Sequence, residues 1–280
     1  MKFINFEGEG KPIAIIKSAN KRIKDKVISV SDKGHGVHRF NHLKLKDDDL
    51  FQLIPNPETE RSIHYITGSS GSGKTYFIKQ FLIEYKKVFP KNQIYLFSPF
   101  DMDDKSFEGI KLIPIKIDDE LLTDKLTSKD FKDSMVVFDD IESIPDKALN
   151  KDVHRILTDI LTTGRHYNVS ACCVYHNCCN AAQTKAILNE SHAITFFPRV
   201  LAGRSLKYLC DNYLGLEASE IKRLKKLKSR AVTVVKGYPR IVVSEKEVYC
   251  LGCDDSDSSD SDSSSSSSEK IVFKNKKKNK

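Results

Sequence analysis

The chain has 280 residues, with 46 lysines and arginines against 38 aspartates and glutamates, which gives a formal net charge of +8. Hydrophobic residues make up 39% and aromatic residues 9%, so the composition predicts a globular protein with a sizeable core and excludes a chain disordered throughout. No run of about 18 apolar residues is present and the first residues, MKFIN, contain no apolar stretch of signal-peptide length, so we expect neither a membrane span nor secretion.

Composition divides the chain into three parts. Residues 1–55 are polar and weakly patterned, with an apolar run at 13–16 and a candidate strand at 27–30, and form a predicted N-terminal extension. Residues 56–253 carry the strong pattern and form the predicted main domain. Residues 254–280, rich in serine and acid and then in lysine, cannot bury enough apolar surface to offset the entropy of ordering, so we expect a disordered tail.

The tail contributes no net charge, because the six acids of residues 254–269 cancel the six lysines of residues 270–280. The whole excess of +8 therefore lies in residues 1–253. The ten serines beside the acids are candidates for phosphorylation, which would make the tail strongly negative; a solubilising tail is the alternative.

Strand-like and helix-like segments alternate from Ser62 onward. Apolar positions between Phe77 and Tyr85 recur at helical spacing and stop at Pro90, and a second set runs from Leu149 to Leu161, with Gly164 where a C-cap glycine would fall. This alternation predicts an α/β fold with a mostly parallel sheet flanked by helices, and a C-terminal β-hairpin. The expected strands are 63–67, 93–97, 135–138, 169–175 and 193–197, and the expected hairpin pairs 231–235 with 241–243.

A glycine-rich loop follows the first of these strands and fits the phosphate-loop pattern G-x-x-x-x-G-K-[ST] at every fixed position. Backbone N–H groups of such a loop converge on phosphate oxygens, and the helix behind it adds its dipole. Lys74 would reach the β- and γ-phosphates, and the Thr75 hydroxyl would bind Mg²⁺. The alternative is a glycine-rich turn without a ligand. The nucleotide-binding candidates are Gly68, Ser69, Ser70, Gly71, Ser72, Gly73, Lys74 and Thr75.

A second acidic site follows the apolar strand 135–138, which ends in Asp139 and Asp140. Ligands of open parallel sheets bind at the carboxyl ends of the strands, so we expect Asp139 to lie near the phosphate loop and to hold Mg²⁺ through water. Asp140 is then placed to orient or deprotonate the attacking water, which favours a hydrolase. Glu142 is a competing candidate for this base, and a helix N-cap is the alternative role for Asp140.

Two further segments flank the fourth strand. The second helix returns the chain to the amino edge of the sheet, so we expect Arg165 to lie far from its own nucleotide. Arg165 would act on a neighbouring subunit as an arginine finger in trans, or bind the sheet edge structurally. His176 and Asn177 end the fourth strand at the ligand edge, where a polar side chain contacts the γ-phosphate or its water; a loop that simply begins with polar residues is the alternative.

Two basic clusters are candidates for contact with nucleic acid, because phosphate contacts dominate affinity that is independent of sequence. The denser cluster, 221–230 (IKRLKKLKSR), has apolar residues at every third position, so one side is expected to pack while the cations face outward. An ordinary solvated face is the alternative for both clusters. The second cluster is Lys17, Lys21, Arg22, Lys24 and Lys26.

The seven cysteines are an odd number and cluster late in the chain, which favours a reducing compartment over a disulfide framework. Cys250 and Cys253 form a single C-x-x-C, whereas structural zinc usually needs four ligands. Cysteines of residues 172–179 would have to complete a zinc site in space. We expect Cys172 and Cys173 to be small buried strand residues instead.

Four blocks in order, GSSGSGKT (68–75), IYLFSP (94–99), VVFDDI (136–141) and GRHYNVS (164–170), resemble the genome-packaging ATPases of large cytoplasmic DNA viruses, of the poxvirus type, within the FtsK/HerA group of P-loop motors. The resemblance covers roughly residues 60–200. Relatives usually carry glutamine where this chain has His176, and the wider group often has glutamate where it has Asp140.

This resemblance implies a P-loop NTPase fold for residues 56–253 and ATP-driven translocation of double-stranded DNA into a capsid by a homo-oligomeric ring, with ATP and Mg²⁺ as cofactors. Capsid or portal proteins are the implied partners, and the viral factory of the host cytoplasm, or the virion, is the implied location. The alternatives are another P-loop ATPase, such as a helicase-like or recombination factor, a small-molecule kinase, or a virion assembly protein triggered by nucleotide.

Overall fold

The computed structural model describes residues 3–18, 24–31, 40–45, 48–59, 61–100, 107–237 and 239–252. The predicted disordered tail lies outside these residues. So do Lys21 and Arg22 of the second basic cluster and Cys253 of the C-x-x-C. No helix in the described ranges combines the length and the apolar character needed to cross a bilayer.

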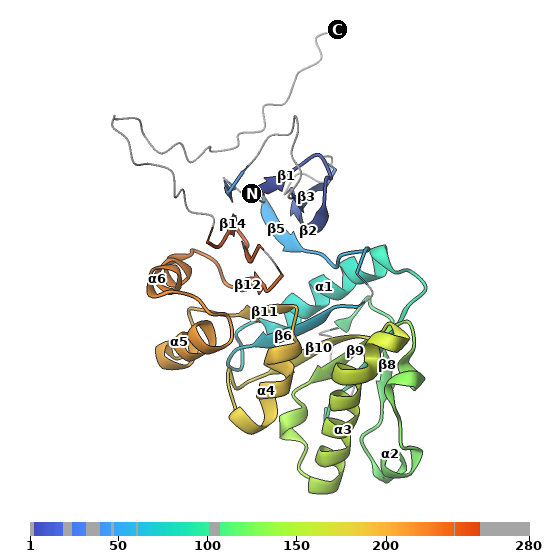
Figure 1. The fold of residues 1–280 in the computed structure, drawn as a ribbon. Helices are drawn as coiled ribbons and strands as arrows, with labels where there is room; N and C mark the ends of the chain where they lie inside the picture. Colours follow the sequence, from blue (N-terminus) through green and yellow to red (C-terminus); the bar gives the residue numbers. More distant parts are fainter. Residues whose placement is uncertain are drawn as a thin grey trace, which may run out of the picture.

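Ten strands of the described residues form one large sheet (Figure 1). Their order is β4 (His42–Lys44), β14 (Glu247–Cys250), β13 (Ile241–Ser244), β12 (Val232–Val235), β11 (Ala193–Phe196), β6 (Ile63–Thr67), β10 (Ser170–Tyr175), β9 (Ser134–Asp139), β7 (Gln93–Phe97) and β8 (Ile113–Ile115). In this order the strands from β11 to β8 run parallel, and β12, β13, β14 and β4 extend the sheet beyond β11 as antiparallel neighbours. This arrangement confirms the predicted α/β class and the C-terminal hairpin.

The central strands are buried on both faces, which explains their nearly continuous apolar sequences. In β9, Met135 and Val137 pack into one core, and Val136 and Phe138 pack into the other. The helix α1 (Lys74–Val88) covers the first face, with a small sheet beside it (Figure 1). Helices of the second face are α3 (Lys147–Thr163), α4 (Ala181–Glu190), α5 (Gly203–Asn212) and α6 (Ala218–Lys226), with the short α2 (Asp119–Asp124) contributing Leu121.

The small sheet is antiparallel and comes from the N-terminal residues, in the order β1 (Phe3–Asn5), β3 (Lys26–Ser31), β2 (Lys11–Lys17) and β5 (Leu50–Leu53). Its apolar side chains join the core that contains α1. The backbone N–H of Phe51 donates to the carbonyl of Glu245, 2.9 Å away, and β4 pairs with β14, so this part of the chain is joined to the large sheet. The predicted apolar run 13–16 lies in β2 and the candidate strand 27–30 lies in β3.

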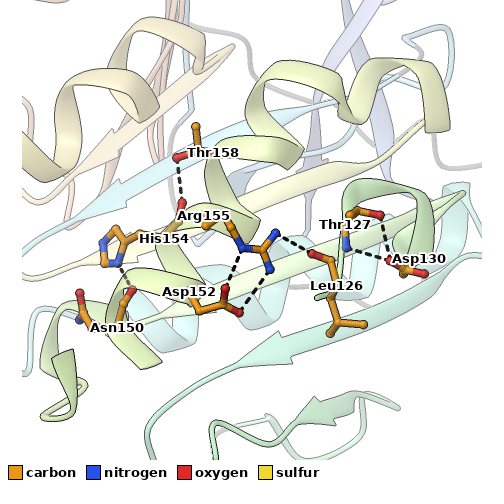
Figure 2. Close-up of polar contacts among 8 residues, drawn as sticks. All are labelled: Leu126, Thr127, Asp130, Asn150, Asp152, His154, Arg155 and Thr158. Carbon is orange, nitrogen blue, oxygen red and sulfur yellow. Dashed lines mark hydrogen bonds and ion pairs between the residues drawn. The ribbon is translucent and has the colours of Figure 1, made fainter. Parts of the chain in front are cut away.

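Polar contacts fix where α3 begins and how it lies against the preceding segment. Asp146 caps the helix by accepting from the N–H groups of Ala148 and Leu149. Figure 2 shows Arg155 of α3 donating both to Asp152, one turn before it, and to the carbonyl of Leu126. These contacts are exposed and contribute little stability individually, but they hold the entry into the 3₁₀ helix η2 (Ser128–Phe131) against α3.

Gly164 follows α3 at the predicted C-cap position but lacks the backbone conformation of a glycine cap. It is the C-cap residue, but its φ of −57° is right-handed, so no left-handed glycine cap forms there. A Cβ at Gly164 would lie 3.2 Å from Nη1 of Arg61, which donates to the carbonyls of Ile160 and Leu161 at the end of the helix. The left-handed residue is Asn168, at φ 56°, after the 3₁₀ helix η4 (Gly164–Tyr167).

Candidate active site

The candidate site lies at the carboxyl edge of the parallel strands. Thr67, the last residue of β6, pairs with Tyr175, and Asp139, the last residue of β9, pairs with Val174, so β10 lies between the phosphate loop and the acidic strand (Figure 1). The N–H of Gly68 donates to the carbonyl of Tyr175 at 3.2 Å and continues the ladder into the loop. The end of β10 is therefore held between the two motifs.

The phosphate loop has the geometry that its glycines require. Gly73 has a φ of 105°, which disfavours any residue with a Cβ, and α1 begins at the next residue, Lys74. A Cβ at Gly68 would lie 2.7 Å from Oγ of Ser72 and 2.8 Å from Cδ2 of Phe197, so this position also has no room for a side chain. The tip, at residues 69–71, is exposed, whereas Ser72 and Lys74 are buried.

Lys74 is joined to the acidic site through His176. Its ammonium donates to the carbonyl of Gly68 at 2.9 Å and lies 3.0 Å from Nδ1 of His176, while Nε2 of His176 lies 2.8 Å from Oδ2 of Asp140. An ammonium group only donates, so Nδ1 accepts and the proton is on Nε2, which donates to Asp140. A neutral imidazole therefore bridges the loop lysine and the second aspartate.

Burial and neighbouring charges shift the pKa values of Asp139, Glu142 and Lys74. Burial, with the neighbouring Asp140, raises the pKa of Asp139 to about 7, although Lys74 opposes the shift. Burial also raises the pKa of Glu142, whose Oε1 accepts from the backbone N–H of His176 at 2.7 Å. Burial lowers the pKa of Lys74, and the three acids partly offset this. Asp140 is held in the left-handed conformation at φ 52°, where its N–H donates to the carbonyl of Val174.

The residues present fit Mg²⁺ bound mainly by water and phosphate. In proteins this ion usually takes one or two carboxylates and a hydroxyl, and substrate phosphates and water supply its remaining ligands. Asp139 and Thr75 offer half-buried oxygen atoms beside the loop, and Oδ1 of Asp140 and Oε2 of Glu142 are buried without a hydrogen-bond partner among the described residues. The described part of the chain holds no cluster of three or more His, Cys, Asp or Glu side chains suited to a metal.

Two predicted site residues do not join this group. Arg165 is exposed on η4 at the amino edge of the sheet, where it lines a cavity of about 900 Å³ with Arg61 and His192, on the side opposite Lys74. Asn177 follows His176 but is exposed, and its backbone carbonyl accepts from the hydroxyl of Tyr65 at 2.7 Å. The ring of His176 is thus the polar group that β10 brings to the phosphate loop.

One residue beside the loop was predicted only as part of the basic cluster. A Cβ placed on Gly73 would lie 3.2 Å from Nε of Arg230, so this guanidinium lies against the phosphate loop. The pairing of Phe196 with Val232 explains the approach, because the antiparallel β12 begins at the edge where β11 ends. The predicted hairpin did not include its pairing with the strand 193–197, so the sequence contained no signal for this contact.

The basic cluster 221–230 has the predicted two-sided character. Ile221, Leu224 and Leu227 are buried, and the lysines between and after them are exposed. Arg223 makes a cation–π contact, with its guanidinium carbon 3.8 Å from the centroid of the Tyr249 ring. In the second cluster, Lys17 forms an ion pair with Glu84 of α1 at 2.9 Å.

The cysteines of β10 are core residues, as predicted. Cys172 and Cys173 are fully buried, on opposite faces of the sheet, and burial raises the pKa of both thiols. Cys250 is buried at the end of β14. Cys253, the second cysteine of the C-x-x-C, lies outside the described residues, so the expectation that this motif does not form a structural zinc site stays a prediction.

The chain is 38% identical over 250 residues to the uncharacterized protein V3 of Sputnik virophage, which covers 88% of this chain and 97% of that protein. This chain belongs to the V3 family. No family model matches it.

Solved structures with a similar fold have low identity to this chain. B204, the DNA-packaging ATPase of Sulfolobus Turreted Icosahedral Virus, is 15% identical over 66% of this chain and 98% of its own, with a TM-score of 0.46. The cytoplasmic domain of the type VII secretion ATPase EccC of Thermomonospora curvata is 11% identical over 73% of this chain and 28% of its own, also at 0.46. Likenesses at this level do not establish an activity.

Proposed function

We propose that this chain is a P-loop ATPase that couples ATP hydrolysis to movement of double-stranded DNA, in the packaging of a viral genome. The observation that supports ATP hydrolysis at this site is the series of contacts from Lys74 through His176 to Asp140 at the carboxyl edge of the sheet. It joins the loop lysine to a carboxylate whose Oδ1 is buried and has no hydrogen-bond partner in the part of the chain that the structure describes. A binding site without hydrolysis does not need that carboxylate.

Each residue has a role that follows from its position. The loop N–H groups and Lys74 bind the phosphates, for which Lys74 turns from the carbonyl of Gly68 toward the ligand. Asp140 accepts a hydrogen bond from the attacking water and orients it. Thr75 and Asp139 would hold Mg²⁺, which when bound neutralises charge on the phosphates.

Contact with DNA is proposed from the exposed lysines of α6 and the segment after it. Lys222, Lys225 and Lys226 are exposed on a helix whose other side is packed, and Lys228 is exposed just after it. Such a row suits phosphates regardless of base sequence. The origin of V3 in a virophage supports a viral role for the family.

An assembled ring is proposed from the position of Arg165. Its guanidinium lies at the amino edge of the sheet, too far away to contact a nucleotide bound to its own chain. It would instead complete the nucleotide site of an adjacent copy. Arg165→Ala should then keep ATP binding and lose hydrolysis. Full hydrolysis by Arg165→Ala would indicate that Arg165 has only a structural role at the sheet edge. Portal or capsid proteins are the further proposed partners, and the viral factory of the host cytoplasm is the proposed location.

The decisive measurement is steady-state ATP hydrolysis by the purified full chain, with and without duplex DNA. We expect hydrolysis that duplex DNA stimulates several-fold, and loss of ATP binding in Lys74→Ala. Lys129→Ala, at an exposed lysine remote from the loop, is the matched control. Hydrolysis without any DNA stimulation would contradict the motor, and phosphorylation of an added small-molecule acceptor would favour a kinase.

A further inference from the structure

We infer that the small N-terminal sheet and Arg230 form the nucleoside subsite of the phosphate-loop site. This inference rests on the proposed nucleotide binding and adds where the base, the ribose and the α-phosphate lie. It gives β5 (Leu50–Leu53) and Arg230 a part in choosing the nucleotide.

The direction of the bound nucleotide follows from the order of the strands. The acids and His176 lie on the β10 and β9 side of β6, and Lys74 points to that side, since it contacts His176. The γ-phosphate, which has to meet the acids, therefore lies there. A triphosphate that follows the loop must extend its nucleoside away from the acids, toward the β11, β12 and β13 side of β6.

A cavity of about 120 Å³ is present on that side. Its wall includes Gly73 of the loop, the first turns of α1, the ends of β12 and β13, and β5 of the small sheet. This volume cannot enclose a whole nucleotide, but it accepts one flat ring system. The lining combines aromatic rings with amides, as base-binding pockets require. The lining residues include Gln52, Tyr76, Phe77, Gln80, Phe197 and Arg230.

Arg230 is fixed in a position that suits an anion. Its backbone N–H donates to Oε2 of Glu245 at 2.9 Å, and Ser229 contacts the same carboxylate oxygen at 3.3 Å. The Glu245 carboxylate thus binds the backbone N–H of Arg230 and not its guanidinium. Within the described residues the Arg230 guanidinium makes no hydrogen bond or ion pair. A guanidinium against Gly73 is well placed for the α-phosphate, because its planar fork matches phosphate oxygens.

Tyr76 lines the cavity from α1 and is largely exposed. Its side chain is 65% exposed, although it is a large aromatic residue one position after Thr75 in the first turn of α1. A base or ribose over this ring would cover apolar surface that the protein leaves in water. Gln52 reaches the same cavity from β5, which is held to the hairpin by the hydrogen bond between Phe51 and Glu245.

The test compares ATP with inorganic tripolyphosphate, which lacks the nucleoside, by calorimetric titration of the full chain with Mg²⁺ present. We expect Tyr76→Ala to weaken ATP binding about 10-fold and to leave tripolyphosphate binding within about twofold, which are the effects of losing a base contact. Tyr76→Phe should restore ATP binding. Arg230→Ala should weaken both ligands. The matched controls are Tyr208→Ala and Arg204→Ala, at exposed residues of α5.

Two results would overturn the inference. One is unchanged ATP affinity in both Tyr76→Ala and Arg230→Ala, and the other is an equal loss of ATP and tripolyphosphate in Tyr76→Ala. Lys74→Ala separates this failure from failure of the proposed function. If Lys74→Ala keeps wild-type affinity for both ligands, the phosphate loop is not the binding site, and the subsite falls with it.

Discussion

Nδ1 of His176 lies 3.0 Å from the ammonium group of Lys74, across 102 positions of sequence. The ring accepts from the lysine on one nitrogen and donates to a carboxylate from the other. When Lys74 moves toward a phosphate, Nδ1 of His176 loses its hydrogen-bond donor. The imidazole ring can then move with the bound ligand. Binding at the loop is thereby linked to the position of Asp140.

Changing His176 tests this link. His176→Ala should reduce hydrolysis about 10- to 100-fold, because Asp140 loses the donor that positions it, while ATP affinity stays close to that of the wild type. His176→Gln should retain much of the activity, because an amide can also accept from Lys74 and donate to Asp140. The measurements are single-turnover hydrolysis and ATP affinity, with exposed His166→Ala as the control. Equal activity of the alanine and glutamine variants would contradict this role.

Asp140 and Glu142 can be separated as candidate bases. Asp140→Asn should keep ATP binding and lose hydrolysis by about 10²- to 10⁴-fold, the range of general base catalysis. Glu142→Gln should change the rate little, because the amide oxygen still accepts from the N–H of His176. Both variants are assayed by ATP affinity and by turnover. The reverse order of effects would move the base to Glu142.

The exposed lysines of the basic cluster predict a change in the salt dependence of DNA binding. Alanine at Lys225, Lys226 and Lys228 should weaken duplex binding and reduce the slope of log affinity against log salt by up to about three, one for each lost phosphate contact. Affinity is measured over a range of salt concentrations. An unchanged slope would assign these lysines to an ordinary solvated face. The control is alanine at three exposed lysines outside this cluster, Lys129, Lys132 and Lys151.

His64 predicts how stability depends on pH. Burial lowers the pKa of this β6 side chain to about 3, and its Nε2 lies 2.7 Å from Oγ1 of Thr195. Between about pH 3 and 6.5 the unfolded chain binds a proton here and the folded chain does not, so the stability contributed by neutral His64 is lost as the pH falls through this window.

His64→Gln should therefore make the free energy of unfolding less sensitive to acid. Between pH 7 and pH 4.5 the wild type should lose roughly 2–3 kcal/mol more than this variant, since two pH units of uncompensated protonation correspond to that energy. Urea unfolding at the two pH values measures the difference. His166→Gln, at an exposed position, should match the wild type. The same acid sensitivity in wild type and His64→Gln would contradict the assignment.

The sequence predicted the central strands well, because strands buried on both faces have a nearly continuous apolar pattern. β6 and β7 have the predicted bounds, and Lys74 begins α1 where the phosphate-loop motif requires. The N-terminal strands were predicted weakly, because β1 and β4 have three residues each and bury only part of their surface. Short strands are defined by their partners more than by their own pattern.

The contacts of the candidate site were less predictable than its motifs. The motifs placed Lys74, Asp139 and Asp140 at one edge, but the insertion of β10 between β6 and β9 decides that His176 bridges them. The approach of Arg230 to Gly73 depends on the antiparallel pairing of β12 with β11. Both are relations between distant segments, which no local pattern encodes.

The pairing of β4 with β14 bears on how much of the chain can be removed. Without residues 1–55, β14 would become an unprotected edge with free backbone donors and acceptors, and α1 would lose the apolar cover of the small sheet. A shortened protein that retains every phosphate-loop and acidic residue should therefore self-associate through that edge. Retention of the known motifs would not make it an independent soluble enzyme.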